Sequence, residues 1–205
     1  MSKSLISKSL KKIITASVCF ICALILVITI SERQTIAQQK FPANSILYNR
    51  QFYKITSGLE EVYKPKDYHS HSELNLSNGQ FFVTQVDSIT SRVVYVRRPR
   101  GASFWLYTQM YSPGTSGFRA GMFSYAPADV DEGDPSLAQQ FYFKKARVAF
   151  DINRNGDLDS SEYLDVVNGR ISVAGANHNY RFSFDLYLEN GQRTVGTFAG
   201  RFPPV

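Results

Sequence analysis

The sequence predicts an all-β protein, an antiparallel β-sandwich or alternatively a β-barrel, preceded by one N-terminal apolar helix. Three observations support this fold class. The chain has 15 Phe and 12 Tyr, which favour strands over helices. From residue 46 onward, short apolar alternations recur with turn residues between them. Outside residues 13–30, no window sustains an apolar period of 3.6 residues.

The 205 residues divide into four segments. Residues 1–12 form a basic region that we expect in the cytoplasm, and residues 13–30 form a transmembrane signal anchor or the core of a signal peptide. Residues 31–45 are a polar linker, and residues 46–205 are an exported β-domain. A domain of this size buries enough surface to fold without disulfides.

The apolar segment determines the expected topology. Residues 13–30 carry no charge, and lysines flank only their N-terminal side, so the positive-inside rule places the following domain outside the cytoplasm. Cleavage near Ala37 would release the domain, and without cleavage residues 13–30 hold it to the membrane. Both cysteines, Cys19 and Cys22, lie in this segment without the small preceding residue of a lipobox, so the exported domain has no thiol.

The exported domain is expected to contain many short strands. Alternation predicts strands at residues 46–56, 72–76, 80–86, 92–97, 103–111, 117–124, 140–150, 180–188 and 192–202. The strongest hairpin joins the last two strands through Asn190-Gly191, a pair that favours a tight two-residue turn.

The charge distribution excludes one class of partner. The net charge is +6, but four lysines before the apolar segment account for most of it and leave +2 for residues 34–205. A domain with that balance lacks the basic surface of a nucleic-acid-binding protein, so no nucleic-acid partner is expected.

Residues 151–162, DINRNGDLDSSE, match the calcium-loop pattern of EF-hand proteins. Ca²⁺ prefers about six to eight oxygen ligands, and a glycine at Gly156 permits the sharp turn that such a loop needs. The flanks do not resemble an EF-hand, since residues 141–150 alternate like a strand. The expected ligands are Asp151, Asn153 and Asn155 through side-chain oxygens, Asp157 through its carbonyl, Asp159 directly or through water, and Glu162 through two oxygens.

Two alternatives remain open around this loop. It is either a structural calcium site or a connecting loop rich in Asn, Asp and Gly that binds nothing. Residues 160–167 form either a short helix or the start of a strand continuing to Val173.

Two further groups of residues have possible functions. Asp67, His69, His71 and Glu73 alternate as metal ligands on one strand face would, but Leu74 and Leu76 assign the opposite face to the core, which favours a solvent-facing polar strand. On residues 104–111, aromatic side chains point to both sides of a strand. One side faces the core. The other side either forms a stacking platform for a sugar or a partner or is itself partly covered, as in a sandwich with both faces covered: Trp105, Tyr107 and Tyr111.

The C-terminal part of the chain resembles a group of exported proteins. The stretches are residues 118–125 (FRAGMFSY), 167–173 (VNGRISV), 182–191 (FSFDLYLENG) and 196–202 (GTFAGRF). They are similar to the closing segment of uncharacterised exported or lipid-anchored β-proteins of Bacteroidetes-type bacteria. The resemblance implies a cell-envelope location and one continuous strand across Gly169, and it implies no activity.

These observations favour a non-catalytic, calcium-stabilised β-domain that serves as a structural or binding module at a bacterial cell envelope, with a glycan or an envelope protein as its partner. A carbohydrate-binding module that uses Trp105 and its neighbours is the first alternative. The second alternative is a hydrolase. The sequence has no G-x-S-x-G, H-E-x-x-H or phosphate-binding motif, so the catalytic acids of such an enzyme would be distant in sequence and meet only in the folded chain.

Overall fold

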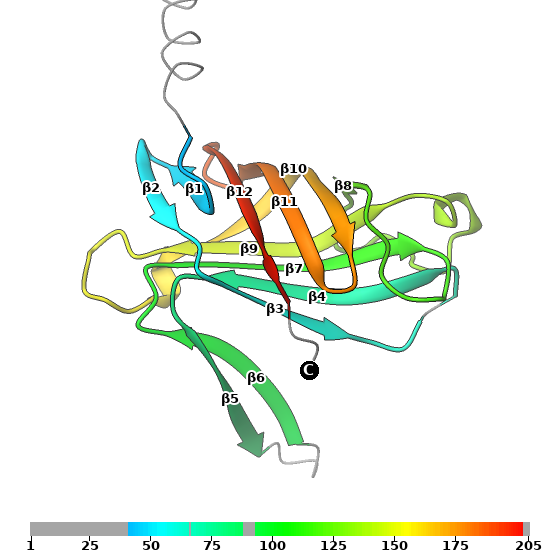
Figure 1. Ribbon diagram of the computed structural model, residues 1–205, viewed down its shortest axis with the longest axis horizontal. Helices are drawn as coiled ribbons and strands as arrows, with labels where there is room; N and C mark the ends of the chain where they lie inside the picture. Colours follow the sequence, from blue (N-terminus) through cyan, green and yellow to red (C-terminus); the bar gives the residue numbers. More distant parts are fainter. Residues whose placement is uncertain (1–40, 66, 88–92, 203–205) are drawn as a thin grey trace, which may run out of the picture. The chain divides into compact units, whose positions relative to one another are not determined.

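The computed structural model describes residues 41–65, 67–87 and 93–202, and it divides the chain into the unit 1–41 and the unit 42–205 (Figure 1). The second unit is described below. The expected signal anchor, residues 13–30, lies outside the described residues. Within those residues, no helix is long and apolar enough to cross a membrane.

The second unit is built from strands, which confirms the predicted fold class. Ten strands form one sheet that curls into a half-barrel, in the order β2-β1-β12-β11-β10-β8-β9-β7-β4-β3, and β5 and β6 form a separate pair. The strands are β1 (Ser45–Tyr48), β2 (Gln51–Lys54), β3 (Ser57–Val62), β4 (His69–Ser77), β5 (Gln80–Asp87), β6 (Val93–Arg100), β7 (Phe104–Pro113), β8 (Met122–Tyr125), β9 (Tyr142–Phe150), β10 (Tyr163–Ala176), β11 (Asn179–Leu188) and β12 (Arg193–Arg201).

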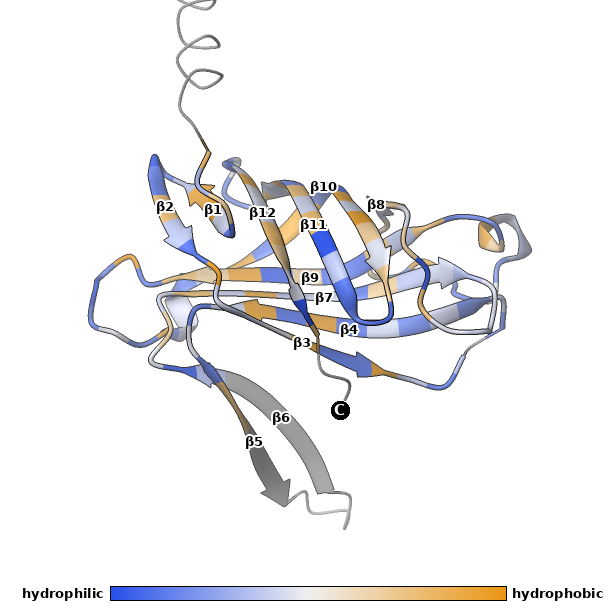
Figure 2. Ribbon diagram, viewed as in Figure 1, coloured by the Kyte–Doolittle hydropathy of each residue, from blue (hydrophilic) through white to orange (hydrophobic). Residues whose placement is uncertain are grey.

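The core lies between the two halves of the curled sheet. Strands β10 to β12 cross over β9, β7, β4 and β3 (Figure 1), so one face of each half is turned toward the other. Their alternating apolar residues, orange in Figure 2, meet there. Phe104, Phe123 and Phe143 are completely buried in this layer, and Phe202 closes it where its ring packs against Gly58 of β3.

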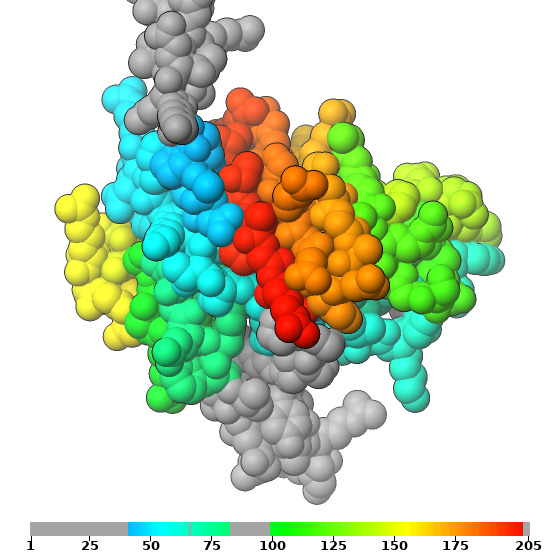
Figure 3. All heavy atoms as spheres, viewed as in Figure 1, coloured from blue at the N-terminus to red at the C-terminus, as the bar shows by residue number. Residues whose placement is uncertain are grey.

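The predicted C-terminal hairpin is confirmed. β11 and β12 pair in register from Tyr187–Arg193 to Asn179–Arg201, around the turn at Asn190-Gly191. β12 then lies between β11 and β1, as Figure 3 shows for the red, orange and blue parts of one face. The first strand of the domain therefore pairs with the last one.

Three elements differ from the prediction. Residues 117–124 were expected as one strand, but β8 begins only at Met122. Residues 46–56, expected as one strand, form the hairpin β1–β2, because Asn49 and Arg50 both adopt positive φ angles of 47° and 63°, as a type I′ turn requires. β3 was not predicted, because a charged residue occupies its core face. Glu60 is completely buried, and it accepts hydrogen bonds from the Ser72 hydroxyl (3.1 Å) and from His178 Nδ1 (2.9 Å).

The chain after residue 162 follows the second of the two alternatives. A single 3₁₀ turn, η2 (Ser160–Glu162), leads directly into β10, which runs through Gly169 without interruption. Gly169 has a φ of 138°, and a Cβ atom there would lie 2.4 Å from the carbonyl oxygen of Asp185. Glycine is therefore required at this position, which follows the register shift of β10 between Val166 and Asn168.

Candidate functional site

The site lies on the face of β3, β4, β7 and β9 that points away from the core. Cross-strand register places polar side chains opposite one another there, with Glu61 beside Glu73, Glu73 beside Gln109, and Gln109 beside Lys144. Because alternate residues of a strand share a face, the aromatic residues Trp105 and Tyr107 are on this face too. The outer face of these four strands therefore carries polar and aromatic side chains.

A cavity of about 630 Å³ occupies this face, within the range of small-molecule sites. Its walls combine aromatic rings with carboxylates and two basic residues. The lining residues are Glu61, Tyr63, Glu73, Asn75, Trp105, Tyr107, Tyr125, Ala128, Lys145, Ala146, Arg147, Asp165 and Val166.

Trp105 is held in a fixed orientation at one end of the cavity. Its indole Nε1 donates a hydrogen bond to the side-chain oxygen of the buried Asn75 (3.0 Å). The ring of Tyr163 meets it edge-on at a centroid distance of 5.6 Å, and the ring of Tyr107 lies 6.1 Å away. An aromatic surface held in this way loses little conformational entropy when a ligand stacks on it.

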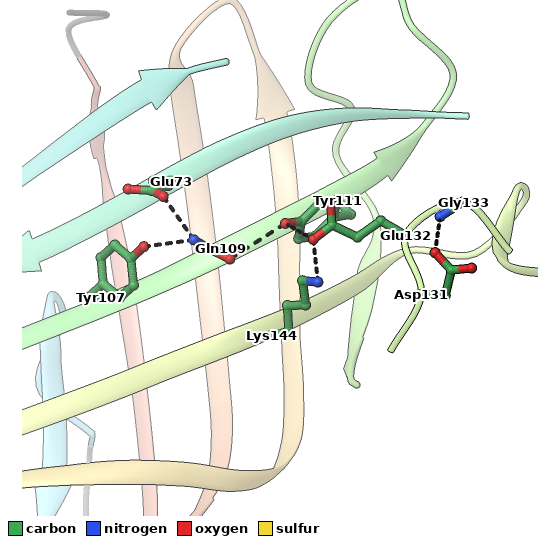
Figure 4. Close-up of polar contacts among 8 residues, drawn as sticks. All are labelled: Glu73, Tyr107, Gln109, Tyr111, Asp131, Glu132, Gly133 and Lys144. Atoms are coloured by element: carbon green, nitrogen blue, oxygen red, sulfur yellow. Dashed lines mark hydrogen bonds and ion pairs between the residues drawn. The ribbon is translucent and has the colours of Figure 1, made fainter. Parts of the chain in front are cut away.

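Two residues of the cavity wall, Tyr107 and Glu73, are joined through hydrogen bonds to Gln109 (Figure 4). The side-chain amide of Gln109 donates to the Glu73 carboxylate (3.0 Å) and to the Tyr107 hydroxyl (3.1 Å). Burial, followed by the negative charge of Glu73, raises the pKa of both Tyr63 and Tyr107 well above its usual range. Both phenols are therefore neutral donors beside this carboxylate.

Tyr111, the third predicted platform residue, does not line the cavity. It is buried, because the segment that follows β8 covers this end of the sheet, and its hydroxyl donates to Glu132 of that segment (3.0 Å). Glu132 also forms an ion pair with the buried Lys144 (Figure 4). Trp105 and Tyr107 thus lie together at the cavity. Tyr111 is instead packed inside the domain.

Of the two histidines of β4 that were expected to face solvent, His69 is buried and His71 is partly exposed. The predicted core parity is correct, since Leu74 and Leu76 are buried in the core, but the segment after β8 covers the other face. His69 is 1% exposed and contacts the carbonyl oxygens of Leu137 and Gln140 through Nε2. Among the described residues, no three His, Cys, Asp or Glu side chains gather as a metal-binding group.

His71 lies in a stack of rings across three strands. Its imidazole is parallel to Tyr111 at 4.5 Å and close to parallel with Tyr63 at 4.8 Å, and Tyr142 continues the stack beyond Tyr111. Its Nε2 is buried and has no hydrogen-bond partner in the described part of the chain. Burial is the main reason why the pKa of His71 is lowered, although Glu73 opposes the shift.

We expect this histidine to make the folded domain sensitive to acid. Because the folded pKa is depressed, the unfolded chain binds a proton first, so stability is lost as the pH falls below the unfolded value of about 6.5 toward the folded pKa. His71→Phe keeps the stacked ring and removes the proton site. Its melting temperature should fall less than that of the wild type between neutral and mildly acidic pH. Equal losses in both proteins would contradict this assignment.

The predicted calcium loop joins β9 to β10. Its first and last residues, Asp151 and Glu162, are buried. Asp151 accepts hydrogen bonds from the backbone N–H groups of Asn155 and Gly156, both at 3.1 Å. Glu162 turns back into the loop and accepts from the backbone of Ile152 (2.7 Å) and from two further N–H groups, those of Asn153 and Asp159.

The polar side chains in the middle of the loop are exposed and form hydrogen bonds with one another. Asp159 Oδ2 accepts hydrogen bonds from the amides of Asn153 and Asn155, each at 3.0 Å. The carbonyl oxygen of each Asn accepts from the backbone two residues onward, at 2.9 Å. Asp157 has an exposed side chain, as expected for a residue that would offer only its backbone carbonyl. The donor set is thus hard oxygen throughout, the chemistry that Ca²⁺ prefers.

Several residues of the cavity were missed by the sequence analysis. Glu61 and Tyr63 belong to β3 and its end, which carry no apolar alternation. Arg147 and Asp165 come from β9 and β10, and only their pairing across the sheet places them near Trp105. Glu73 was considered only as a metal ligand. Its alternation with Asn75 on the face opposite Leu74 was the available signal.

Comparisons with known proteins give no family for this chain. Neither family models, nor curated proteins, nor solved structures yielded a match.

Proposed function

We propose that this protein is a non-catalytic binding module of the bacterial cell envelope, and that its ligand is a glycan bound in the cavity on the outer face of β3, β4, β7 and β9. The aromatic-lined cavity is the observation that supports this proposal most directly. Sugar rings present C–H faces that pack on aromatic rings, and their hydroxyls hydrogen-bond to side-chain carboxylates and amides. Trp105 and Tyr107 supply the first kind of group, and Glu73 and Asn75 supply the second.

Calcium is the second part of the proposal. Residues 151–162 would hold one structural Ca²⁺ through the six predicted ligands, with a Kd on the order of 10⁻⁴–10⁻³ M, typical of extracellular modules. The ion would replace the amide groups that now satisfy Asp159. It would stabilise the junction of β9 and β10, two strands that also contribute Arg147 and Asp165 to the cavity wall.

The location follows from the N-terminal segment. An uncleaved apolar segment at residues 13–30 would attach the module to the membrane, and cleavage near Ala37 would release it. In either case the domain would meet envelope polysaccharides, and it would do so where calcium is available.

The proposal is tested by measuring glycan binding to the full-length chain in detergent. We expect at least one β-linked oligosaccharide on a glycan panel to bind, and Trp105→Ala to weaken its binding by about tenfold or more, since stacking on such a ring contributes about 1–2 kcal/mol. Met122→Ala, an exposed residue of β8 outside the cavity, is the control and should bind normally. Binding that is indifferent to Trp105→Ala, or cleavage of the bound oligosaccharide, would overturn the proposal.

A further inference from the structure

We infer that the cavity selects a ligand that carries an ammonium group, so that an amino sugar binds in preference to a neutral or N-acetylated one. This inference rests on the proposed function and specifies the chemistry of its ligand. It is carried by the position of Glu73 among aromatic rings and by the kind of groups that surround its carboxylate.

Glu73 is a half-buried carboxylate whose hydrogen-bond partners are neutral. Gln109 donates to it at 3.0 Å, and the phenols of Tyr63 and Tyr107 interact with it. Among the residues that the structure describes, no lysine, arginine or histidine forms an ion pair with Glu73. A carboxylate whose hydrogen-bond partners are neutral gains most from a cation that it can contact directly.

A second carboxylate lies beside Glu73 in the cavity wall. Glu61 of β3 is directly opposite Glu73 in the antiparallel register, and both line the cavity. Residues opposite each other in such a pair have Cβ atoms about 5 Å apart, so one ammonium group can lie within reach of both carboxylates. Tyr63 donates a hydrogen bond to Glu61 (3.2 Å) and also interacts with Glu73, so both carboxylates lie near the same phenol.

The basic residues of the wall belong to β9. Arg147 forms an ion pair with Asp165 at 2.7 Å. Lys145 is exposed on β9, and β7 separates β9 from the strand that carries Glu73. Their positions leave Glu73 facing the aromatic rings.

The aromatic rings complete a site for a cation. Tyr63, Trp105, Tyr107 and Tyr125 all contribute to the lining of the cavity that Glu73 enters. Ammonium groups are attracted to the negative faces of such rings, and more strongly where water is excluded. Rings and carboxylate together thus favour a charged amine, whereas rings alone would accept any sugar.

The inference is tested by calorimetric titration of the full-length chain with glucosamine and N-acetylglucosamine oligosaccharides of equal length and linkage, at mildly acidic pH where the amine is charged. We expect the glucosamine oligosaccharide to bind about tenfold more tightly or better, and added salt to reduce the difference. Glu73→Gln, which keeps the shape of the side chain, should abolish the preference, and Glu61→Gln should reduce it. Asp185→Asn removes an exposed charge from β11, outside the cavity, and should leave it intact.

The outcomes separate this inference from the proposed function. Equal affinities for the two oligosaccharides, with binding still lost in Trp105→Ala, would overturn the ammonium preference and leave a glycan-binding module. An ammonium preference that survives Glu73→Gln in a protein with a wild-type circular dichroism spectrum would also overturn the inference. Binding of neither oligosaccharide, nor of any other on the glycan panel, would overturn both proposals.

Discussion

Removal of calcium should lower the melting temperature of the domain by about 5–10 °C. At a calcium concentration about 100 times the Kd, occupancy of one site adds about 2.7 kcal/mol to the free energy of unfolding, and a domain of this size shifts by about 2–4 °C per kcal/mol. Without the ion, four carboxylates crowd into residues 151–162. The measurement is thermal unfolding of the full-length chain in excess calcium and in EDTA.

Variants separate the ion from the loop itself. Glu162→Gln should abolish the difference between calcium and EDTA, because it removes the two-oxygen ligand. It should also lower stability in EDTA by about 1–3 kcal/mol, because buried Glu162 is the charged acceptor for three backbone N–H groups. Asp129→Asn, an exposed acid outside the loop, should keep the wild-type response. A wild-type melting temperature that is the same in calcium and EDTA would show that residues 151–162 are a connecting loop without a structural calcium ion.

Glu132→Ala should destabilise the domain by about 3 kcal/mol. The substitution leaves the ammonium group of Lys144 in a position where only 4% of its side chain is exposed, and an unpaired buried charge is costly. It also removes the acceptor of the Tyr111 hydroxyl. Urea-induced unfolding, followed by circular dichroism, measures the change.

The matched comparison is an ion pair on the surface. Asp185→Ala breaks the pair with Arg193, in which both side chains are about half exposed, and it should cost less than about 1 kcal/mol. Combining Glu132→Gln with Lys144→Met removes both buried charges and should recover part of the stability lost in Glu132→Ala. A cost for Glu132→Ala no greater than that for Asp185→Ala would show that the pair contributes little.

The fold class and most strands followed from local patterns. Alternation in β7, β9, β11 and β12 was visible because apolar residues on one face are a direct consequence of a one-sided core. β3 was missed for the converse reason, since Glu60 occupies a core position with partners from β4 and from the β10–β11 turn. A local sequence pattern cannot predict a buried carboxylate whose hydrogen-bond donors are distant in the sequence.

The candidate site divides in the same way. The loop at 151–162 was recognisable because its residues are contiguous and its glycine is required by geometry. Trp105 and Tyr107 were recognisable as platform residues because alternate residues of a strand lie on the same face. Tyr111 lies on the same face, but the segment around Glu132 covers it. Which loop covers a strand depends on tertiary structure and is not apparent from the local sequence. The carboxylates beside the platform likewise depend on which strands become neighbours.

The pairing of β1 with β12 imposes an order on folding. In a chain that emerges N-terminus first, the β1–β2 hairpin is made early, yet it joins the sheet through β12, the last strand to appear. Ile46, which is completely buried in the finished domain, lies opposite Gly196 of that strand. Closure therefore depends on contacts that span the whole domain, which makes folding slow. Until β12 arrives, the edge of β1 that pairs with it has no strand beside it, and unpaired strand edges make folding intermediates prone to aggregation.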